Sequence, residues 1–466
     1  MLKTSEKSIL ALRKILKDSD YLFVMKELRG ASDFVNPWYA FEDMKRAMEK
    51  LDSPYRHTLE LLQMGLDAER AQIAGEIGEE ALEAILECGL WEEREGRIFC
   101  RNLVVLTYRG LYLVTELNPW YETCTNRNTD VYIGSDSLRL AENISWRRGA
   151  RVLDLCSGTG IQGMMAARSA EHVVSVEINP KAVPVTRFNI RLNGMEDIME
   201  VREGDLYDVL REGETFDCIY ANPPFIPMLD TVEYPICGAG GEDGLRVLNR
   251  IMEGLPERLA PGGEVVIFCE CLGDEKGVFY DRDVRRVCEE NAWKCVASHQ
   301  LRMIAGLQIE KLAELSALFS ESFDSADFKK RMREIYVRLG ASYLYNIVYR
   351  MENTGNFAFE AVDSFNPWHT ADRAGIAPDL TRRQVGDFTC LGLGGQEKRM
   401  VLPDVAELVS TLGEGYTLEE AVKWLYYKYK ATLIGKNVRF YGYLASVMET
   451  CRLLEQDGIL ERKTIH

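Results

Sequence analysis

One short segment limits what this chain can fold into: an apolar run from Cys218 to Ala221 passes directly into Asn222-Pro223-Pro224-Phe225. Two consecutive prolines remove two backbone donors and hold φ near about −65°, so neither a strand nor a helix continues through them. The segment therefore predicts a rigid turn after a buried strand. Because ligands of open α/β sheets bind at the carboxyl ends of the strands, this turn is a candidate pocket for a flat, nitrogen-bearing group.

A second turn from strand to helix is predicted further upstream. The apolar run Val152 to Leu155 is followed by the small-residue loop Cys156 to Gly160 and then by a helical pattern through Met164 and Ala167. Glycine loops at the start of a helix often bind phosphate. Here the spacing departs from G-x-G-x-x-G, because Cys156 stands where the first glycine would be.

Acidic residues follow the ends of three predicted strands. Glu177 ends the run from Val173 and is suited to accept hydrogen bonds from both hydroxyls of a ribose. Asp205, with Leu206 beside it, is placed to accept one from an adenine amino group. Together with Asp154, these like charges disfavour a pyrophosphate. They favour a cationic nucleoside without phosphate, such as S-adenosylmethionine.

In this order, the segments resemble those of the class I S-adenosylmethionine-dependent methyltransferases. The resemblance covers about residues 130 to 302 and implies a Rossmann-like α/β fold: a doubly wound, mostly parallel, seven-stranded sheet whose last strand is expected at 343–350. It also implies roles for individual positions. Those expected to bind S-adenosylmethionine are Asp154, Cys156, Ser157, Gly158 and Gly160 under the methionine moiety, Glu177 and Ile178 at the ribose, Asp205 and Leu206 at the adenine, and Asn222.

The proline turn itself matches the catalytic N/D-P-P-Y/F motif of methyltransferases that act on nitrogen, which implies catalytic roles for Asn222, Pro223, Pro224 and Phe225. The stretches 240–245 and 259–263 look like those of the HemK-type glutamine methyltransferases. One departure is Val131-Tyr132-Ile133-Gly134-Ser135-Asp136, where HemK-type enzymes carry a segment that contains Arg-Pro.

The proline turn also suggests a mechanism. An acceptor N–H₂ group can donate to the side-chain carbonyl of Asn222 and to the main-chain carbonyl of Pro223, while Phe225 stacks on the planar acceptor. These contacts orient the nitrogen, so no general base is assigned. We predict an N-methyltransferase whose acceptor is an amide or amino nitrogen of a peptide, protein or specialised metabolite. The alternatives are an RNA base amine as acceptor and a non-catalytic protein that binds S-adenosylmethionine.

Charge counts against nucleic acid as a partner. The chain has 56 basic and 73 acidic residues, a net charge of −17, which repels a phosphate backbone at long range. The basic run 329–333 is interleaved with Asp327 and Glu334, which favours a solvated helix face. The twelve cysteines lack paired C-x-x-C spacing, so no metal site is expected. No secretory signal or apolar run of about 18 residues is found, so we expect no membrane partner and a cytoplasmic location.

Three domains are expected from these patterns. Residues 1–125 form a helical, winged-helix-like accessory domain, residues 126–350 form the methyltransferase core with a helical insertion at about 303–340, and residues 351–466 form a mainly helical domain with winged-helix-like features. One candidate helix of the first domain carries Glu76, Glu79, Glu80 and Glu83. It is therefore expected to contact protein, peptide or substrate rather than phosphate.

Overall fold

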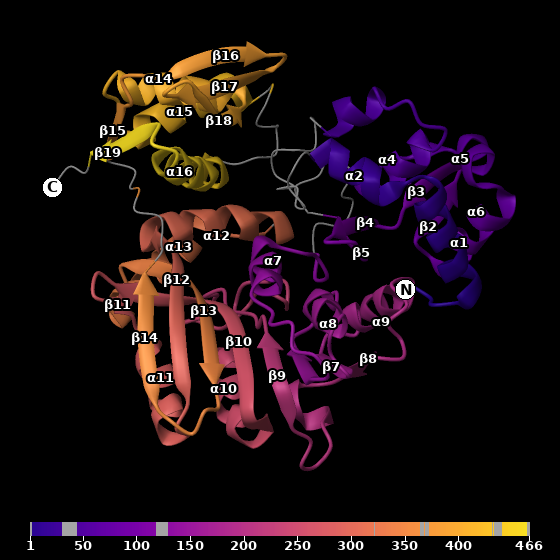
Figure 1. Cartoon of the computed structure of the whole chain (residues 1–466), viewed down its shortest axis with the longest axis horizontal. Helices are drawn as coiled ribbons and strands as arrows, with labels where there is room; N and C mark the ends of the chain where they lie inside the picture. Colours follow the sequence, from indigo (N-terminus) through magenta and orange to yellow (C-terminus); the bar gives the residue numbers. More distant parts are fainter. Residues whose placement is uncertain are drawn as a thin grey trace. The chain divides into compact units, whose positions relative to one another are not determined.

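The computed structural model describes residues 2–29, 44–117, 129–320, 322–363, 368, 372–430, 432 and 440–463. The chain divides into two compact units, residues 1–364 and residues 365–466. The first unit contains a large central sheet and the helices packed around it, and Figure 1 shows the strands of this sheet side by side.

The central sheet has nine strands, in the order β14-β12-β13-β10-β9-β6-β7-β8, with β11 paired to β10. All strands on the path from β14 to β8 run in one direction except β13, which is antiparallel to both of its neighbours. The strands are β6 (Arg151–Leu155), β7 (His172–Glu177), β8 (Met199–Glu203), β9 (Phe216–Ala221), β10 (Leu259–Asp274), β11 (Gly277–Val278), β12 (Lys294–Ile304), β13 (Tyr343–Glu352) and β14 (Ala358–Asp363).

The predicted α/β fold with a mostly parallel sheet is confirmed. The central strands β6, β7 and β9 are buried along almost their whole length, as expected for strands with helices on both faces. The strand expected at 343–350 is β13. The sheet exceeds the predicted seven strands by β14 at one edge and the two-residue β11, whose short or polar sequences carry little strand signal.

Helices connect these strands and cover the sheet. They are α7 (Ser135–Glu142), α8 (Ile161–Ala167), α9 (Ala182–Leu192), the 3₁₀ helix η1 (Leu206–Val209), α10 (Arg246–Arg258), α11 (Asp281–Glu290), α12 (Ala305–Phe319) and α13 (Ser325–Leu339). Figure 1 shows α7, α12 and α13 at the end of the sheet toward which the parallel strands point. This is the end where ligands of such sheets bind.

The residues before the sheet form helices and small sheets of their own. The described elements are α1 (Glu6–Asp18), α2 (Tyr21–Arg29), α4 (Arg56–Met64), β1 (Ala68–Glu69), α5 (Arg70–Ile77), α6 (Glu79–Cys88), β2 (Trp91–Arg94), β3 (Arg97–Cys100), β4 (Leu103–Tyr108) and β5 (Leu111–Glu116). Their apolar side chains share one core with Phe188 and Leu192 of α9. This part of the chain is therefore packed directly onto helix α9 beside the central sheet.

Two asparagines, Asn189 of α9 and the C-cap residue Asn193, bind strand β5 as a neighbouring strand would. Asn189 accepts from the Val114 amide at 2.7 Å and donates to the Val114 carbonyl at 2.9 Å. Asn193 makes the same pair of bonds with Tyr112, at 2.9 and 2.7 Å. Asn189 Nδ2 also donates to the Thr159 carbonyl at 3.0 Å. One buried side chain thus joins β5 to the loop that follows β6.

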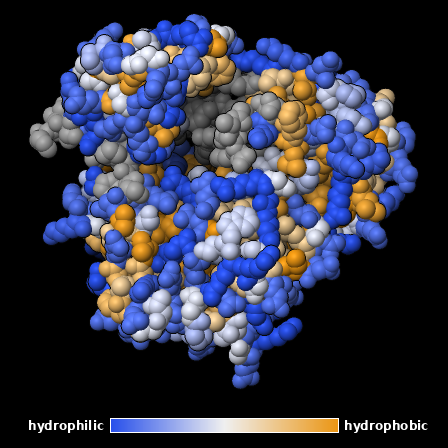
Figure 2. Space-filling view, viewed as in Figure 1, coloured by the Kyte–Doolittle hydropathy of each residue, from blue (hydrophilic) through white to orange (hydrophobic). Residues whose placement is uncertain are grey.

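The second unit combines strands and helices. They are β15 (Arg373–Ile376), β16 (Thr381–Val385), β17 (Phe388–Leu393), β18 (Gln396–Val401), α14 (Pro403–Gly413), α15 (Leu418–Tyr429), α16 (Phe440–Gln456) and β19 (Leu460–Lys463). Strands β16, β17 and β18 form an antiparallel sheet, and β15 pairs with β19. Hydrophilic residues cover most of the face seen in Figure 2. Within the described ranges, no helix combines the length and apolar character needed to span a membrane.

Candidate active site

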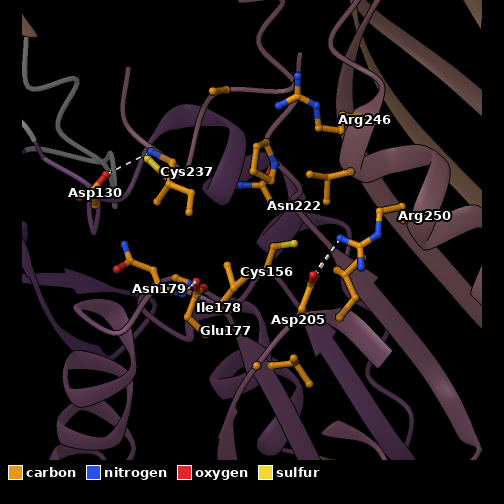
Figure 3. Close-up of a pocket in the computed structure, with 18 residues that line it drawn as sticks. Asp130, Cys156, Glu177, Ile178, Asn179, Asp205, Asn222, Cys237, Arg246 and Arg250 are labelled. Atoms are coloured by element: carbon orange, nitrogen blue, oxygen red, sulfur yellow. Dashed lines mark hydrogen bonds and ion pairs between the residues drawn. The ribbon is translucent and has the colours of Figure 1, made fainter. Parts of the chain in front are cut away.

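A pocket lies at the carboxyl ends of β6, β7, β8 and β9 (Figure 3). It is lined by residues of the loops after these strands, of the loop after Phe225 and of α10: Asp130, Cys156, Gly158, Val176, Glu177, Ile178, Asn179, Gly204, Asp205, Leu206, Asn222, Pro224, Ile236, Cys237, Ala239, Arg246, Val247 and Arg250. In Figure 3, Glu177 and Asp205 lie on either side of Cys156, and Asn222 lies across the pocket from them.

The loop after β6 reaches the pocket through a left-handed backbone. Cys156 has φ of 56° and Gly158 has φ of 55°, and only glycine adopts such values without cost. Helix α9 supports this loop from below, since Thr186 Oγ1 donates to the Gly158 carbonyl at 2.7 Å and Asn189 binds the Thr159 carbonyl. The loop thus presents backbone to the pocket on a fixed support.

Glu177 forms one side of the pocket, with both carboxylate oxygens held by backbone. Oε2 accepts from the Gly158 amide at 2.7 Å, and Oε1 accepts from the Asn179 amide at 2.8 Å. Each oxygen keeps a further lone pair that can accept from a ligand hydroxyl. Burial raises the pKa of Glu177, although the two amide bonds oppose that rise.

Asn179 adds a donor that the sequence did not reveal. Its Oδ1 accepts from the Lys181 amide at 2.9 Å, which fixes the orientation of the side-chain amide. Asn179 is 5% exposed, and its Nδ2 has no hydrogen-bond partner within the described part of the chain. A buried donor without a partner costs free energy, so this atom is available to a bound ligand.

Asp205 and Leu206 form the other side. Leu206 has a left-handed φ of 48°, and both oxygens of Asp205 accept from Nη1 of Arg250 at 3.0 Å. The sequence predicts Asp205 as an acceptor for an adenine amino group. The structure adds an ion pair with α10, which neutralises this carboxylate and leaves its remaining lone pairs for a ligand.

The proline turn contributes Asn222 and Pro224 to the pocket. Asn222 Nδ2 donates to Asp136 Oδ2 at 2.7 Å and to Ser137 Oγ at 3.4 Å. Its Oδ1 is buried without a partner in the described residues. This acceptor is therefore free to take a hydrogen bond from an incoming N–H group.

Five of the residues predicted for the site lie outside the pocket lining: Asp154, Ser157, Gly160, Pro223 and Phe225. Asp154 joins β6 to α8 and β7, because its Oδ2 accepts from the Gly163 amide and from Ser175 Oγ, both at 3.0 Å. Burial raises its pKa to about 7. Phe225 is 8% exposed and packs edge-on against Phe268. The ring of Phe225 thus packs against strand β10, and its stacking on the acceptor stays a prediction.

The remaining predicted residues line the pocket together: Cys156, Gly158, Glu177, Ile178, Asp205, Leu206, Asn222 and Pro224. The sequence missed Asp130, Asn179, Ile236, Cys237, Arg246 and Arg250. Only Asn179 had a local signal, because it directly follows Glu177 and Ile178 at a strand end. The donor set fits a cationic nucleoside, since the carboxylates outnumber the arginines and Asn179 and Asn222 offer a free donor and a free acceptor.

Comparison with known proteins gives the same region a family. Residues 129–272 match the family model described as methyltransferase small domain. A Methanocaldococcus jannaschii protein, provisionally named a protein N5-glutamine methyltransferase, is 32% identical over 146 residues, which are 30% of this chain and 72% of that protein.

Two further relatives are covered over a smaller share of their own length. The release factor glutamine methyltransferase of Clostridium acetobutylicum is 35% identical over 26% of this chain, and the ribosomal protein uL3 glutamine methyltransferase of Bradyrhizobium diazoefficiens is 33% identical over 26%. The present chain spans 47% and 40% of their respective lengths. The pocket at the strand ends and the similarity to these relatives point to the same family. The chain belongs to the class I S-adenosylmethionine-dependent methyltransferases, in the family that includes the protein N5-glutamine methyltransferases.

Proposed function

We propose that this protein is an S-adenosylmethionine-dependent N-methyltransferase that methylates a planar amide nitrogen, foremost that of a glutamine side chain in a protein or peptide. The observation that carries the proposal is the state of the Asn222 amide. Its Nδ2 is anchored by Asp136, while its buried Oδ1 has no partner among the described residues and lies beside the pocket. The names of the glutamine methyltransferase relatives support the same acceptor class.

In this proposal the chain acts mainly by alignment. An acceptor N–H₂ group donates to Asn222 Oδ1 and to the Pro223 carbonyl, which turns the nitrogen lone pair toward the pocket. Bound S-adenosylmethionine supplies the methyl group at its sulfonium centre. Glu177 and Asn179 hold the nucleoside on the opposite wall. The nitrogen loses its proton after the new bond forms, so the proposal assigns no catalytic base.

An RNA base amine is a weaker candidate for the acceptor. The basic run 329–333 lies on α13, and three of its four charges are paired: Lys329 and Arg333 contact Glu310 of α12, and Arg331 contacts Asp327 at 3.8 Å. Ion pairs within the protein reduce the charge available to a phosphate backbone. The pattern supports the solvated helix face that the sequence favoured.

The test compares wild type with Asn222→Ala. Methyl transfer to the protein fraction of a lysate is measured with labelled S-adenosylmethionine, and mass spectrometry locates the added methyl group. We expect wild type to methylate glutamine side chains. Asn222→Ala should lower the transfer rate by about 100-fold, because it removes the acceptor contact that orients the nitrogen.

Calorimetry of S-adenosylmethionine binding completes this test, since the variant should retain its affinity to within about threefold. The exposed Asn356→Ala serves as the matched control and should resemble wild type in both measurements. Methylation confined to RNA, or cofactor binding without any transfer in wild type, would contradict the proposal. The second result would favour the non-catalytic binding protein.

A further inference from the structure

The segment that departs from the HemK-type pattern lies next to the proposed catalytic turn. Gly134 is the N-cap of α7, and Asp136 belongs to the first turn of that helix. Although 86 residues separate them in the chain, Asp136 Oδ2 lies 2.7 Å from Asn222 Nδ2. The departure therefore places a carboxylate where it contacts the side chain on which acceptor binding depends.

This contact determines which way the Asn222 amide faces. A carboxylate only accepts hydrogen bonds, so it binds the Nδ2 donor and repels the Oδ1 acceptor of an asparagine. A hydrogen bond to an ionised partner is also stronger than one between neutral groups. With Nδ2 held by Asp136, Oδ1 is directed away from α7, and it is this atom that is buried without a partner among the described residues.

Gly134 gives independent evidence that the carboxylate needs this position. Its φ of −95° and ψ of 176° are ordinary extended values that any residue can adopt. However, a Cβ added at Gly134 would lie 2.1 Å from Asp136 Oδ1 and 3.3 Å from its Cγ. A side chain at 134 would therefore displace the Asp136 carboxylate, whereas the backbone there would accept any residue.

We propose that Asp136 is a positioning residue for methyl transfer: it fixes the Asn222 amide with Oδ1 toward the acceptor nitrogen, and Gly134 leaves the space in which it does so. This inference rests on the proposed function, because it assigns Asn222 the role of acceptor contact. It adds that the orientation of Asn222 is set from α7 and not by the proline turn alone.

A charge-swap experiment tests the orientation directly. Asn222→Asp places two carboxylates in contact and should lower kcat/KM for the acceptor by about 100-fold. In the double variant Asp136→Asn with Asn222→Asp, residue 136 supplies the N–H donor and residue 222 keeps a free oxygen for the acceptor. We expect the double variant to recover at least about tenfold over Asn222→Asp. If the loss of kcat/KM in the double variant equals the product of the losses in the two single variants, the inference is wrong.

Gly134→Ala provides the steric version of the same test. It should lower kcat/KM for the acceptor by about tenfold while the affinity for S-adenosylmethionine and the melting temperature stay near wild type. Gly75→Ala is the matched control, because Gly75 lies in α5 and its added Cβ would meet no atom within 4 Å. Full activity of Gly134→Ala together with full activity of Asp136→Ala would contradict the inference.

A spectroscopic measurement separates this inference from the proposed function, because it needs no acceptor. In protein labelled with ¹⁵N-asparagine, the side-chain N–H₂ signal of Asn222 is identified by its loss in Asn222→Ala. We expect Asp136→Ala to shift this signal and to speed its hydrogen exchange. An unchanged signal would refute the positioning role even if methyl transfer is observed. A changed signal in a protein without transferase activity would refute only the proposed function.

Discussion

At the scale of single residues, the pocket combines groups that fold the protein with groups left over for a ligand. Glu177 has both oxygens bound to backbone amides, whereas Asn179 Nδ2 and Asn222 Oδ1 are buried and unpaired among the described residues. Leaving such atoms unpaired costs about 1–3 kcal/mol each. Unsatisfied buried polar atoms are rare in folded proteins, so the presence of two of them in one pocket points to binding.

Asn179→Asp tests whether the unpaired Nδ2 donor of Asn179 binds S-adenosylmethionine. The new side chain still accepts from the Lys181 amide but replaces the free N–H₂ group with a carboxylate oxygen, on a residue whose main-chain amide binds Glu177. We expect the affinity for S-adenosylmethionine to fall by about tenfold or more, because a donor is lost and like charges are brought together. Calorimetry measures the change. Asn356→Asp, an exposed substitution of the same kind, should leave the affinity unchanged, and equal affinities in all three proteins would exclude the donor role.

Sequence information was sufficient for the residues that end strands. Glu177 and Asn222 were recognised because each ends or follows an apolar run, and Asp205 because it comes after the end of the next predicted strand. All three line one pocket. Contacts between residues far apart in the sequence could not be predicted from such patterns. Nothing near Asp205 in the sequence indicates Arg250, and nothing near Asn222 indicates Asp136. The burial of Phe225 likewise depends on Phe268 of β10, which only the strand order places beside it.

At the scale of secondary-structure elements, a buried histidine joins two strands of the sheet and a helix. His299 of β12 contacts Asp281 of α11 through Nε2 at 3.1 Å and Asp363 of β14 through Nδ1 at 2.6 Å. Tyr345 of β13 lies against its ring. Burial lowers the pKa of His299, but hydrogen bonds and charges from the two aspartates outweigh that effect and raise it above its ordinary value. The charged imidazole therefore holds the edge strand β14 and α11 to the sheet.

This cluster predicts a pH dependence of stability. Because the pKa of His299 is higher in the folded than in the unfolded protein, its contribution is complete below about pH 6.5 and is lost as the pH rises through the folded-state pKa. We expect the melting temperature of wild type to fall between about pH 6 and about pH 9, and that of His299→Gln to fall less. His172→Gln, at a half-exposed pair with Glu200, is the control. Parallel curves for wild type and His299→Gln would contradict the assignment.

At the scale of the whole molecule, every residue that lines the pocket belongs to the first compact unit. We therefore predict that a fragment of residues 1–364 folds and binds S-adenosylmethionine with an affinity within about threefold of the full chain. Calorimetry on both proteins, with circular dichroism to verify folding, checks this. A folded fragment that binds more than about tenfold less tightly would show that the second unit contributes to cofactor binding.

The paired asparagines of α9 carry a consequence for exchange of parts between related proteins. Side-chain amides occupy the outer hydrogen-bonding edge of β5, so no further strand can extend that hairpin without displacing them. A chimera that replaces the N-terminal segment but lacks matching amides on α9 would expose this edge to intermolecular pairing. Such a chimera would also lose the link that Asn189 makes between the hairpin and the Thr159 carbonyl. Exchange of the N-terminal segment would therefore change the support of the pocket loop that follows β6.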